Sequence, residues 1–283
     1  MVPQPIVDSH VHLWNTTKFR YEWLDGLPAL NRPFRPADFA AASASADVSK
    51  FILIECGCEP TQSLAEVDWI SSMAKNEPRL KGIIAHASLE RGKAVRCELE
   101  TLASRPLVKG IRRNLQSEPE AEFCLRSEFA SGVRLLAEFG FTFDLCLRHE
   151  QLPAAAELAR RVPEVTFILD HLGKPDVRNQ SFQPWAKDLE ALAALPNVVA
   201  KVSGLTTEAN WTCWQPTEFT FYLRHACSSF GPGRLMFGSD WPVMTLATSY
   251  QRWIETVETY IPISQEQDWV QLFRTNAERI YRV

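Results

Sequence analysis

The chain has 283 residues, enough to bury a substantial core, and its 30 basic and 34 acidic side chains leave a formal net charge of −4. This balance provides no broad basic field, so we expect neither nucleic acid nor an anionic lipid surface as a partner. No apolar run is long enough to span a bilayer, and the first residues lack the layout of a signal peptide, so we expect a cytoplasmic protein. The remaining partner class is a small molecule, and both a monomer and a homodimer are compatible with the sequence.

The seven cysteines indicate reduced thiols rather than a disulfide framework. They are odd in number, show no paired C-x-x-C spacing and mostly lie in apolar runs, as core thiols do. Cys56-Gly57-Cys58 could suggest a redox or metal site, but a single C-x-C motif at a strand end is more often packing, and we interpret it in that way.

One unit, a short β-branched run followed by a longer segment with helical periodicity, repeats along the chain. The predicted strands are Ile6–His12, Phe51–Cys56, Lys81–His86, Val108–Arg113, Phe141–Leu147, Thr166–Asp170, Val198–Ser203 and Leu235–Ser239. The predicted helices include Thr61–Asn76, Arg91–Ser104, Glu122–Phe139, Gln151–Arg161, Gln183–Leu195 and Thr217–Phe230. Eight such units predict an α/β fold, a parallel (β/α)8 TIM barrel of ~250 residues, in a single domain that spans residues 1–283.

Two segments depart from the repeat. Asn15–Phe39, rich in aromatic residues, Arg and Pro, directly follows the first strand, so we expect a long loop on the catalytic face. Ser249–Val283 predicts one or two C-terminal helices that close the outside of the barrel. We expect specificity to depend on the first loop and on Thr206–Pro216, which also follows a strand.

Two histidines close the first strand in the sequence Asp8-Ser9-His10-Val11-His12-Leu13-Trp14. On a strand, side chains two apart point to the same face, so His10 and His12 can direct two imidazoles at one spot. Asp240 follows the last strand, and the carboxyl ends of barrel strands meet at one face. The alternative is a pair of core histidines and a turn-capping aspartate. We favour a catalytic or metal-ligand role for all three.

Other ionisable side chains recur at the predicted strand ends, where burial is costly unless the groups are paired or functional. His171 ends the sixth strand, and we favour a functional role over a capping role. Arg112 and Arg113 are adjacent and face opposite ways on a strand, so we expect Arg112 to enter the barrel mouth and Arg113 to pair with the helical layer. Glu55 and His86 could make either inward polar contacts or structural pairs.

Aromatic residues and two further histidines lie beside these ends. Trp14 and Trp241 could pack in loops or contact the face of a sugar ring. His149 lies a few residues past the fifth strand and His225 lies within a helix, and we interpret both as non-catalytic.

Four segments, in this order along the chain, resemble the amidohydrolase superfamily and its branch of sugar-acid lactonases and pyrone-dicarboxylate lactonase. They are Asp8–Trp14, Lys109–Arg112, Leu169–Pro175 and Phe237–Pro242. The resemblance runs through nearly the whole chain. It implies a hydrolase that opens a cyclic ester, such as a fuconolactone or a rhamnonolactone.

The resemblance also implies roles for individual residues. Asp240 would be the general base on the attacking water, and His171 a polarising or ligand histidine. His10 and His12 would be metal ligands or electrophilic groups, with Asp240 as a third ligand if a metal is bound. Arg112 would be a substrate clamp. From their places at or beside the strand ends, and not from the resemblance, Trp14, Glu55, His86 and Trp241 are further candidate substrate-binding residues.

Two departures limit the cofactor that the resemblance implies. Related binuclear enzymes carry a bridging lysine or glutamate at the end of the fourth strand, but here Ile111-Arg112-Arg113 occupies that place and Lys109 lies too early. Many mononuclear relatives offer a histidine from the fifth strand, whereas this strand ends Asp144-Leu145-Cys146-Leu147-Arg148. We therefore expect either one divalent metal, with zinc preferred, or an enzyme that works without a metal.

Three alternatives to a sugar lactonase stay open. The same branch opens pyrone dicarboxylates, although the aromatic count of this chain favours a sugar. The superfamily also includes metal-dependent decarboxylases, which normally keep the fifth-strand histidine. A barrel retained as a binding protein would explain the fold but not the polar side chains at the strand ends.

Overall fold

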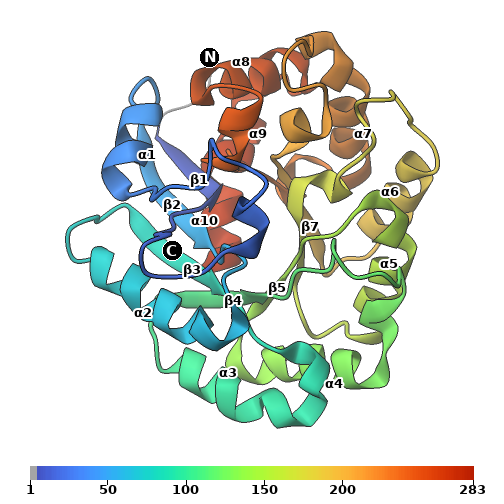
Figure 1. Ribbon diagram of the computed structural model, residues 1–283. Coiled ribbons are helices and arrows are strands. Elements are labelled where there is room, and N and C mark those ends of the chain that lie inside the picture. Colours follow the sequence, from blue (N-terminus) through green and yellow to red (C-terminus); the bar gives the residue numbers. More distant parts are fainter. Residues whose placement is uncertain (1–4) are drawn as a thin grey trace.

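Eight parallel strands form a ring in the order of the chain, from β1 to β8 (Figure 1). This computed structural model describes residues 5–283. The strands are β1 (Ile6–Val11), β2 (Val48–Ile54), β3 (Leu80–Ala85), β4 (Val108–Arg112), β5 (Thr142–Leu145), β6 (Phe167–Leu169), β7 (Val198–Val202) and β8 (Leu235–Phe237). The predicted (β/α)8 barrel is confirmed, and the strand boundaries differ from the predicted ones by three residues or fewer.

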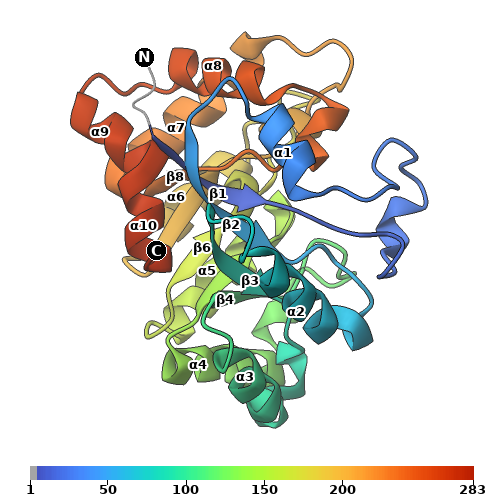
Figure 2. The ribbon, with the colours of Figure 1, turned by 90° about the vertical axis from the view of Figure 1, so that its left-hand side faces the viewer.

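Helices cover the outside of the ring (Figures 1 and 2). They are α1 (Pro36–Ala42), α2 (Ser63–Met73), α3 (Arg96–Ala103), α4 (Ser127–Phe139), α5 (Leu152–Arg161), α6 (Trp185–Ala193), α7 (Thr220–Phe230) and α8 (Tyr250–Tyr260). Several begin later than predicted, because a 3-10 segment precedes them, as at Leu89–Val95 before α3. Gly92 in that segment has a φ of +59°, which an α-helix does not contain. No helix within residues 5–283 is both long and apolar enough to cross a membrane.

The predicted loop after β1 extends to Arg35. Trp14 forms an antiparallel bridge with Phe34, which holds the two ends of the loop together. α1 then begins at Pro36, three residues before the predicted end of the loop. The reason is a local cap: Asp38 Oδ2 accepts a hydrogen bond of 2.8 Å from the backbone N–H of Arg35.

The C-terminal segment departs from its predicted place. It forms α8, α9 (Glu266–Val270), a π-helical turn (Gln271–Thr275) and α10 (Asn276–Tyr281). α8 lies on the outside as expected, but Figure 1 shows α10 over the middle of the strand ring, so the expectation of an outside position is wrong for α10. Ala277 and Tyr281 pack against inward apolar side chains such as Val7 and Met236. α10 therefore covers the amino-terminal end of the barrel interior, which would otherwise expose these side chains to water.

The seam between β1 and β8 closes the ring at the carboxyl ends of both strands. Val11 forms a parallel bridge with Trp241. The backbone N–H of His12 donates to Trp241 O at 2.7 Å, and that of Asp240 donates to His10 O at 2.9 Å. The first and last strands thus meet at the residues that the sequence predicts as catalytic.

Asp8 supports this seam from behind. Its Oδ1 accepts hydrogen bonds from the backbone N–H groups of His10 and Ser239, at 3.1 and 2.9 Å. Its Oδ2 accepts from the Tyr250 hydroxyl of α8 at 2.9 Å. The pairing register of β1 shifts after Asp8, so this side chain faces α8 although it lies two residues before His10. Burial raises the pKa of Asp8 to about 6, although the hydrogen bonds from Ser239 act in the opposite direction.

Asp8→Ala should lower the free energy of unfolding by about 2–4 kcal/mol, because three buried donors lose their acceptor. Urea unfolding followed by circular dichroism measures this change. Asp25→Ala is the control, since its carboxylate pairs with Arg20 on the surface. That variant should change the free energy by no more than about 0.5 kcal/mol. Equal unfolding midpoints for Asp8→Ala and the wild type would contradict the role of Asp8 at the seam.

Candidate active site

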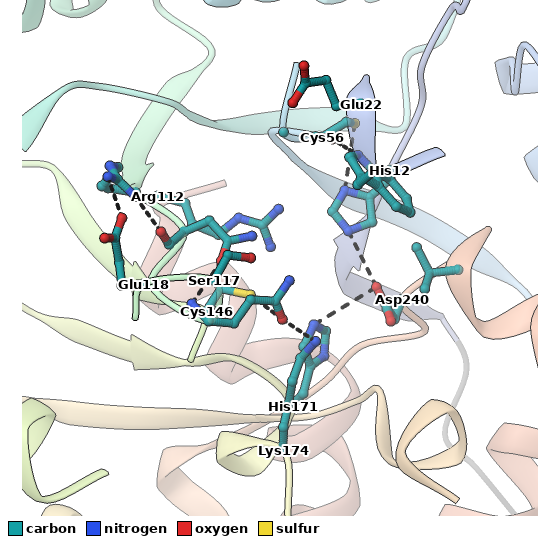
Figure 3. A pocket seen from close by; sticks show the side chains of 16 residues that line it. His12, Glu22, Cys56, Arg112, Ser117, Glu118, Cys146, His171, Lys174 and Asp240 are labelled. Atoms are coloured by element: carbon teal, nitrogen blue, oxygen red, sulfur yellow. Dashed lines mark hydrogen bonds and ion pairs between the residues drawn. The ribbon is translucent and has the colours of Figure 1, made fainter. Parts of the chain in front are cut away.

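Two imidazoles and one carboxylate converge at the β1–β8 seam. The Nε2 atoms of His10 and His12 lie 3.2 Å apart. Asp240 Oδ1 lies 3.3 Å from His12 Nε2 (Figure 3). It lies 3.7 Å from His10 Nε2. A Cβ atom on Gly238 would lie 2.8 Å from His10 Cβ, so a glycine is needed where β8 passes His10. The structure therefore brings together the three residues predicted as possible metal ligands.

His171 joins this group from the end of β6. Its Nδ1 lies 2.9 Å from Ser203 Oγ, and its Nε2 lies 4.0 Å from Asp240 Oδ1. His171 and Asp240 have φ angles of 54° and 62°, a conformation that is uncommon for residues with a side chain and that clusters at functional sites. Gly204 makes room for the ring, because a Cβ atom there would lie 2.4 Å from His171 Nδ1.

Burial and mutual contact set the charges of these groups. Burial alone would raise the pKa of Asp240, but the three neighbouring imidazoles have the larger combined effect and hold this pKa below its usual range. Burial lowers the pKa of His10 well below its ordinary value and that of His171 to about 4. At neutral pH, Asp240 is therefore ionised, while His10 and His171 are uncharged and each keep a lone pair on one ring nitrogen.

Hydrogen bonds on the far side of the two β1 imidazoles assign their tautomers. His12 Nδ1 lies 3.0 Å from Ile54 O, which can only accept, so Nδ1 carries a hydrogen and Nε2 is the ring nitrogen that faces Asp240. His10 Nδ1 lies 3.3 Å from Asp170 Oδ1 and 3.2 Å from Lys201 Nζ. The ammonium has closer carboxylate partners, so we assign the hydrogen of His10 to Nδ1, where it faces Asp170. Both Nε2 atoms then point at the same spot as Asp240.

A buried ion-pair network lies beneath the imidazoles, and sequence reasoning missed its centre, Lys201. This fully buried side chain on β7 places Nζ 2.5 Å from Asp144 Oδ2 and 2.9 Å from Asp170 Oδ1. Tyr281 of α10 donates its hydroxyl to Asp144 Oδ2 at 3.0 Å. Burial raises the pKa of Asp144 to about 6, and Lys201 offsets part of this rise. The feature of the sequence that could have pointed to Lys201 is its charge within the otherwise apolar run Val198–Val202.

Arg112 links this network to Glu55. Its Nε donates to Glu55 Oε1 at 2.7 Å, its Nη2 to Glu55 O at 2.5 Å, and its Nη1 to Asp170 Oδ2 at 3.3 Å. Because a guanidinium has five N–H groups, two remain for a ligand. Arg113 pairs with Glu118 at 2.7 Å, and both arginines line the pocket described next. Arg112 enters the barrel mouth as expected, and Arg113 also pairs with Glu90 of the 3-10 segment before α3, at 3.2 Å. Only the expectation that Arg113 stays outside the mouth is wrong.

A pocket of about 590 Å³ opens at the carboxyl ends of the strands (Figure 3). It is lined by His12, Glu22, Trp23, Cys56, Gly57, Arg112, Arg113, Asn114, Gln116, Ser117, Glu118, Cys146, His171, Lys174, Asp240 and Val243. The predicted site residues among them are His12, Arg112, His171 and Asp240, and His10 lies directly behind His12. Sequence reasoning missed the polar residues after β4, since loop side chains carry no periodic signal.

The other predicted substrate-binding residues lie outside the lining of this pocket, as far as residues 5–283 are concerned. Trp14 is buried, and its indole N–H donates to backbone carbonyls of the following loop. Trp241 is buried between two phenylalanine rings, with centroid distances of 5.4 and 5.3 Å. Glu55 is held by Arg112, whose guanidinium keeps the pKa of Glu55 below its ordinary value although burial acts in the opposite direction. His86 lies outside the pocket lining. The described loop Thr206–Pro216 contributes no lining residue either.

The three convergent atoms have the spacing of metal ligands. Ligands on a tetrahedral zinc ion, with bonds of about 2.0–2.2 Å, lie about 3.3–3.6 Å apart. The distances here are 3.2, 3.3 and 3.7 Å. Buried carboxylates also outnumber buried cations in this part of the described chain. The carboxylates are Asp144, Asp170, Asp240 and Glu55, and the cations are Arg112 and Lys201. A divalent cation would balance this surplus, so the residues present fit a metal.

Comparisons with known proteins agree with this geometry. The family model described as "Amidohydrolase" matches residues 7–283. An L-fucono-1,5-lactonase of Burkholderia multivorans is 32% identical over 279 residues, covering 90% of this chain and 88% of the relative. An L-rhamnono-gamma-lactonase of Scheffersomyces stipitis is 25% identical and covers 98% of each chain.

A solved structure extends the likeness to three dimensions. An amidohydrolase of Burkholderia multivorans with bound zinc matches with a TM-score of 0.87 and 28% identity, covering 98% of this chain and 99% of that one. The family match spans nearly all of the chain, including every strand of the barrel and all four residues at the seam and β6. The chain therefore belongs to the amidohydrolase family of enzymes.

Proposed function

We propose that the protein is a lactonase that opens a sugar aldonolactone, of the fuconolactone or rhamnonolactone type, to the free aldonic acid. The observation that carries this proposal is the ionised Asp240 on the wall of the pocket, within 4.0 Å of three histidine ring nitrogens. Such a carboxylate can take a proton from water beside groups that stabilise an oxyanion. The names of the two lactonase relatives support the same reaction class.

The reaction needs one proton acceptor and one oxyanion stabiliser. Asp240 takes a proton from water, and the water oxygen attacks the lactone carbonyl carbon. The Ser203 hydroxyl can donate to His171 Nδ1, which leaves an Nε2–H on His171 to donate to the developing oxyanion. The ring C–O bond then breaks, and the leaving alkoxide takes the proton that Asp240 removed from water.

His10 Nε2, His12 Nε2 and Asp240 Oδ1 would hold one divalent metal ion, for which zinc is the best match in ligand type and spacing. When bound, the ion would lower the pKa of a water molecule and polarise the carbonyl. The chain's own contribution is to orient the ligands: Ile54 O holds His12, and Asp170 holds His10.

The pocket favours a neutral substrate over a pyrone dicarboxylate. Three cationic side chains line it, and each already has a carboxylate partner. Arg112 pairs with Glu55 and Asp170, Arg113 with Glu118, and Lys174 with Glu208 at 3.7 Å. A dicarboxylate would have to compete with these partners for the cations, whereas a sugar hydroxyl can bond to them without breaking the pairs.

Hydrolysis of a lactone panel, followed with a pH indicator, tests the proposed reaction and substrate class. Neutral aldonolactones should give a kcat/KM at least ~10-fold above that of a pyrone dicarboxylate. The dicarboxylate would separate the cations of the pocket from their carboxylate partners, and a site discriminates strongly against a substrate that leaves its buried polar groups unpaired. Preference for the dicarboxylate would support the alternative lactonase. Release of carbon dioxide from an aromatic acid, without lactone hydrolysis, would refute both the aldonolactonase and the pyrone-dicarboxylate lactonase hypotheses.

Asp240→Asn should lower kcat on the preferred lactone by at least ~10²-fold, because the amide cannot take the proton from water. The circular dichroism spectrum should match that of the wild type. Asp68→Asn serves as the control, since Asp68 pairs with Arg105 on the outer surface, and its kcat should stay at the wild-type value. A near-normal kcat in Asp240→Asn would rule out Asp240 as the base.

A further inference from the structure

One tryptophan lies on the pocket wall with its ring fixed. Trp23 is 38% exposed and is the one tryptophan among the lining residues of the described chain. Its indole N–H donates to Cys56 O at 2.8 Å, and its ring meets Trp14 edge to face at a centroid distance of 5.4 Å. The polar atom of the indole is therefore already satisfied, and the exposed part of the ring is an apolar surface.

The chain after β4 forms a second wall, which we call the polar wall and define as residues 114–118. Its lining side chains are Asn114, Gln116, Ser117 and Glu118, all of them polar. The backbone N–H groups of Leu115 and Gln116 both donate to Cys146 O, at 2.9 and 3.1 Å. Asn114 Oδ1 accepts from Gln116 N at 3.0 Å, which closes a tight turn. These bonds fix the polar wall before any ligand arrives.

Two of the polar-wall side chains also have their orientation set by a neighbour. Gln116 Oε1 accepts a hydrogen bond of 2.6 Å from Lys174 Nζ, so the amide NH2 group of Gln116 is left to donate elsewhere. Glu118 is held by Arg113 at 2.7 Å. The wall therefore offers neutral donors and acceptors rather than free charge.

The two walls stand on different sides of the pocket. Trp23 is bonded to the chain that follows β2, at Cys56, whereas the polar wall is bonded to the chain that follows β5, at Cys146. Figure 3 shows Cys56 and Ser117 on separate sides of the cavity, with Asp240 on a third side. A ligand that fills the pocket would thus meet an apolar ring, a row of neutral polar groups and the general base.

We propose that Trp23 and the polar wall form a sugar-ring subsite that selects hydroxylated lactones. The proposal rests on the proposed lactonase function and adds the residues that recognise the ring. The C–H face of the lactone packs on the Trp23 indole, and the ring hydroxyls bond to Asn114, Gln116 and Ser117. Sites built to pair with hydroxyls reject analogues that lack them, because their own polar groups are left unpaired.

The test compares two substrates, the aldonolactone best hydrolysed by the wild type and δ-valerolactone, which has the ester ring but no hydroxyls. Ser117→Ala and Asn114→Ala should each lower the ratio of kcat/KM for the aldonolactone to kcat/KM for δ-valerolactone by ~10-fold. Trp23→Ala should raise KM for the aldonolactone by ~10-fold and change kcat far less, since stacking is present in both ground state and transition state.

Trp211→Ala is the matched control for Trp23→Ala. Trp211 is 42% exposed and donates its indole N–H to Thr207 O at 2.8 Å, so it shares the exposure and anchoring of Trp23, but it does not line the pocket. Its kinetic constants should equal those of the wild type. A substrate ratio unchanged in both polar-wall variants, or equal KM values for Trp23→Ala and Trp211→Ala, would overturn the subsite.

The same assay separates failure of the subsite from failure of the proposed function. If the wild type hydrolyses no aldonolactone, the function is wrong and the subsite falls with it. If the wild type hydrolyses the aldonolactone and the variants keep the wild-type ratio and KM, the subsite alone is wrong. A loss of activity that is equal on both lactones indicates a structural role for the mutated residue and also contradicts recognition.

Discussion

The close approach of His10 Nε2, His12 Nε2 and Asp240 Oδ1 is the constraint on which the rest of the structure depends. Three polar atoms from the ends of two strands come this close only if the backbone on both sides holds them in place. The β1–β8 seam supplies this support through reciprocal hydrogen bonds between the two strand ends. Asp8 fastens the seam to α8, and Gly238 lets β8 pass close to His10. The barrel is thus closed at the place where His10, His12 and Asp240 gather.

The buried charges beneath the site both orient His10 and engage Arg112 at the pocket. Burying ions is costly unless they are paired, and here Lys201 and Arg112 both contact Asp170, which in turn orients His10. Tyr281 carries the same network down to α10 at the other end of the barrel. Because Arg112 is engaged in this support, the pocket holds little free positive charge. One network therefore orients His10 and engages the guanidinium of Arg112 at the pocket.

Sequence patterns predicted the eight strands, because a short β-branched run between two helical segments is compatible with few structures other than a β-strand. They also indicated that His10 and His12 share a face, since side chains two apart on a strand do so. The same rule fails for Asp8, because a register shift that leaves no mark in the sequence turns it outward. Periodicity did not place α10 across the amino-terminal end of the barrel, because an amphipathic helix can bury its apolar face there or on the outside. Lys201 showed a charge in an apolar strand, but its partners come from segments that only the fold brings together.

The most direct test of the central claim is the anomalous diffraction of crystals grown with zinc. We expect one strong peak bounded by His10 Nε2, His12 Nε2 and Asp240 Oδ1, at about 2.0–2.2 Å from each atom. A zinc peak at another site with none at this one, or imidazoles of β1 that point away from Asp240, would contradict it.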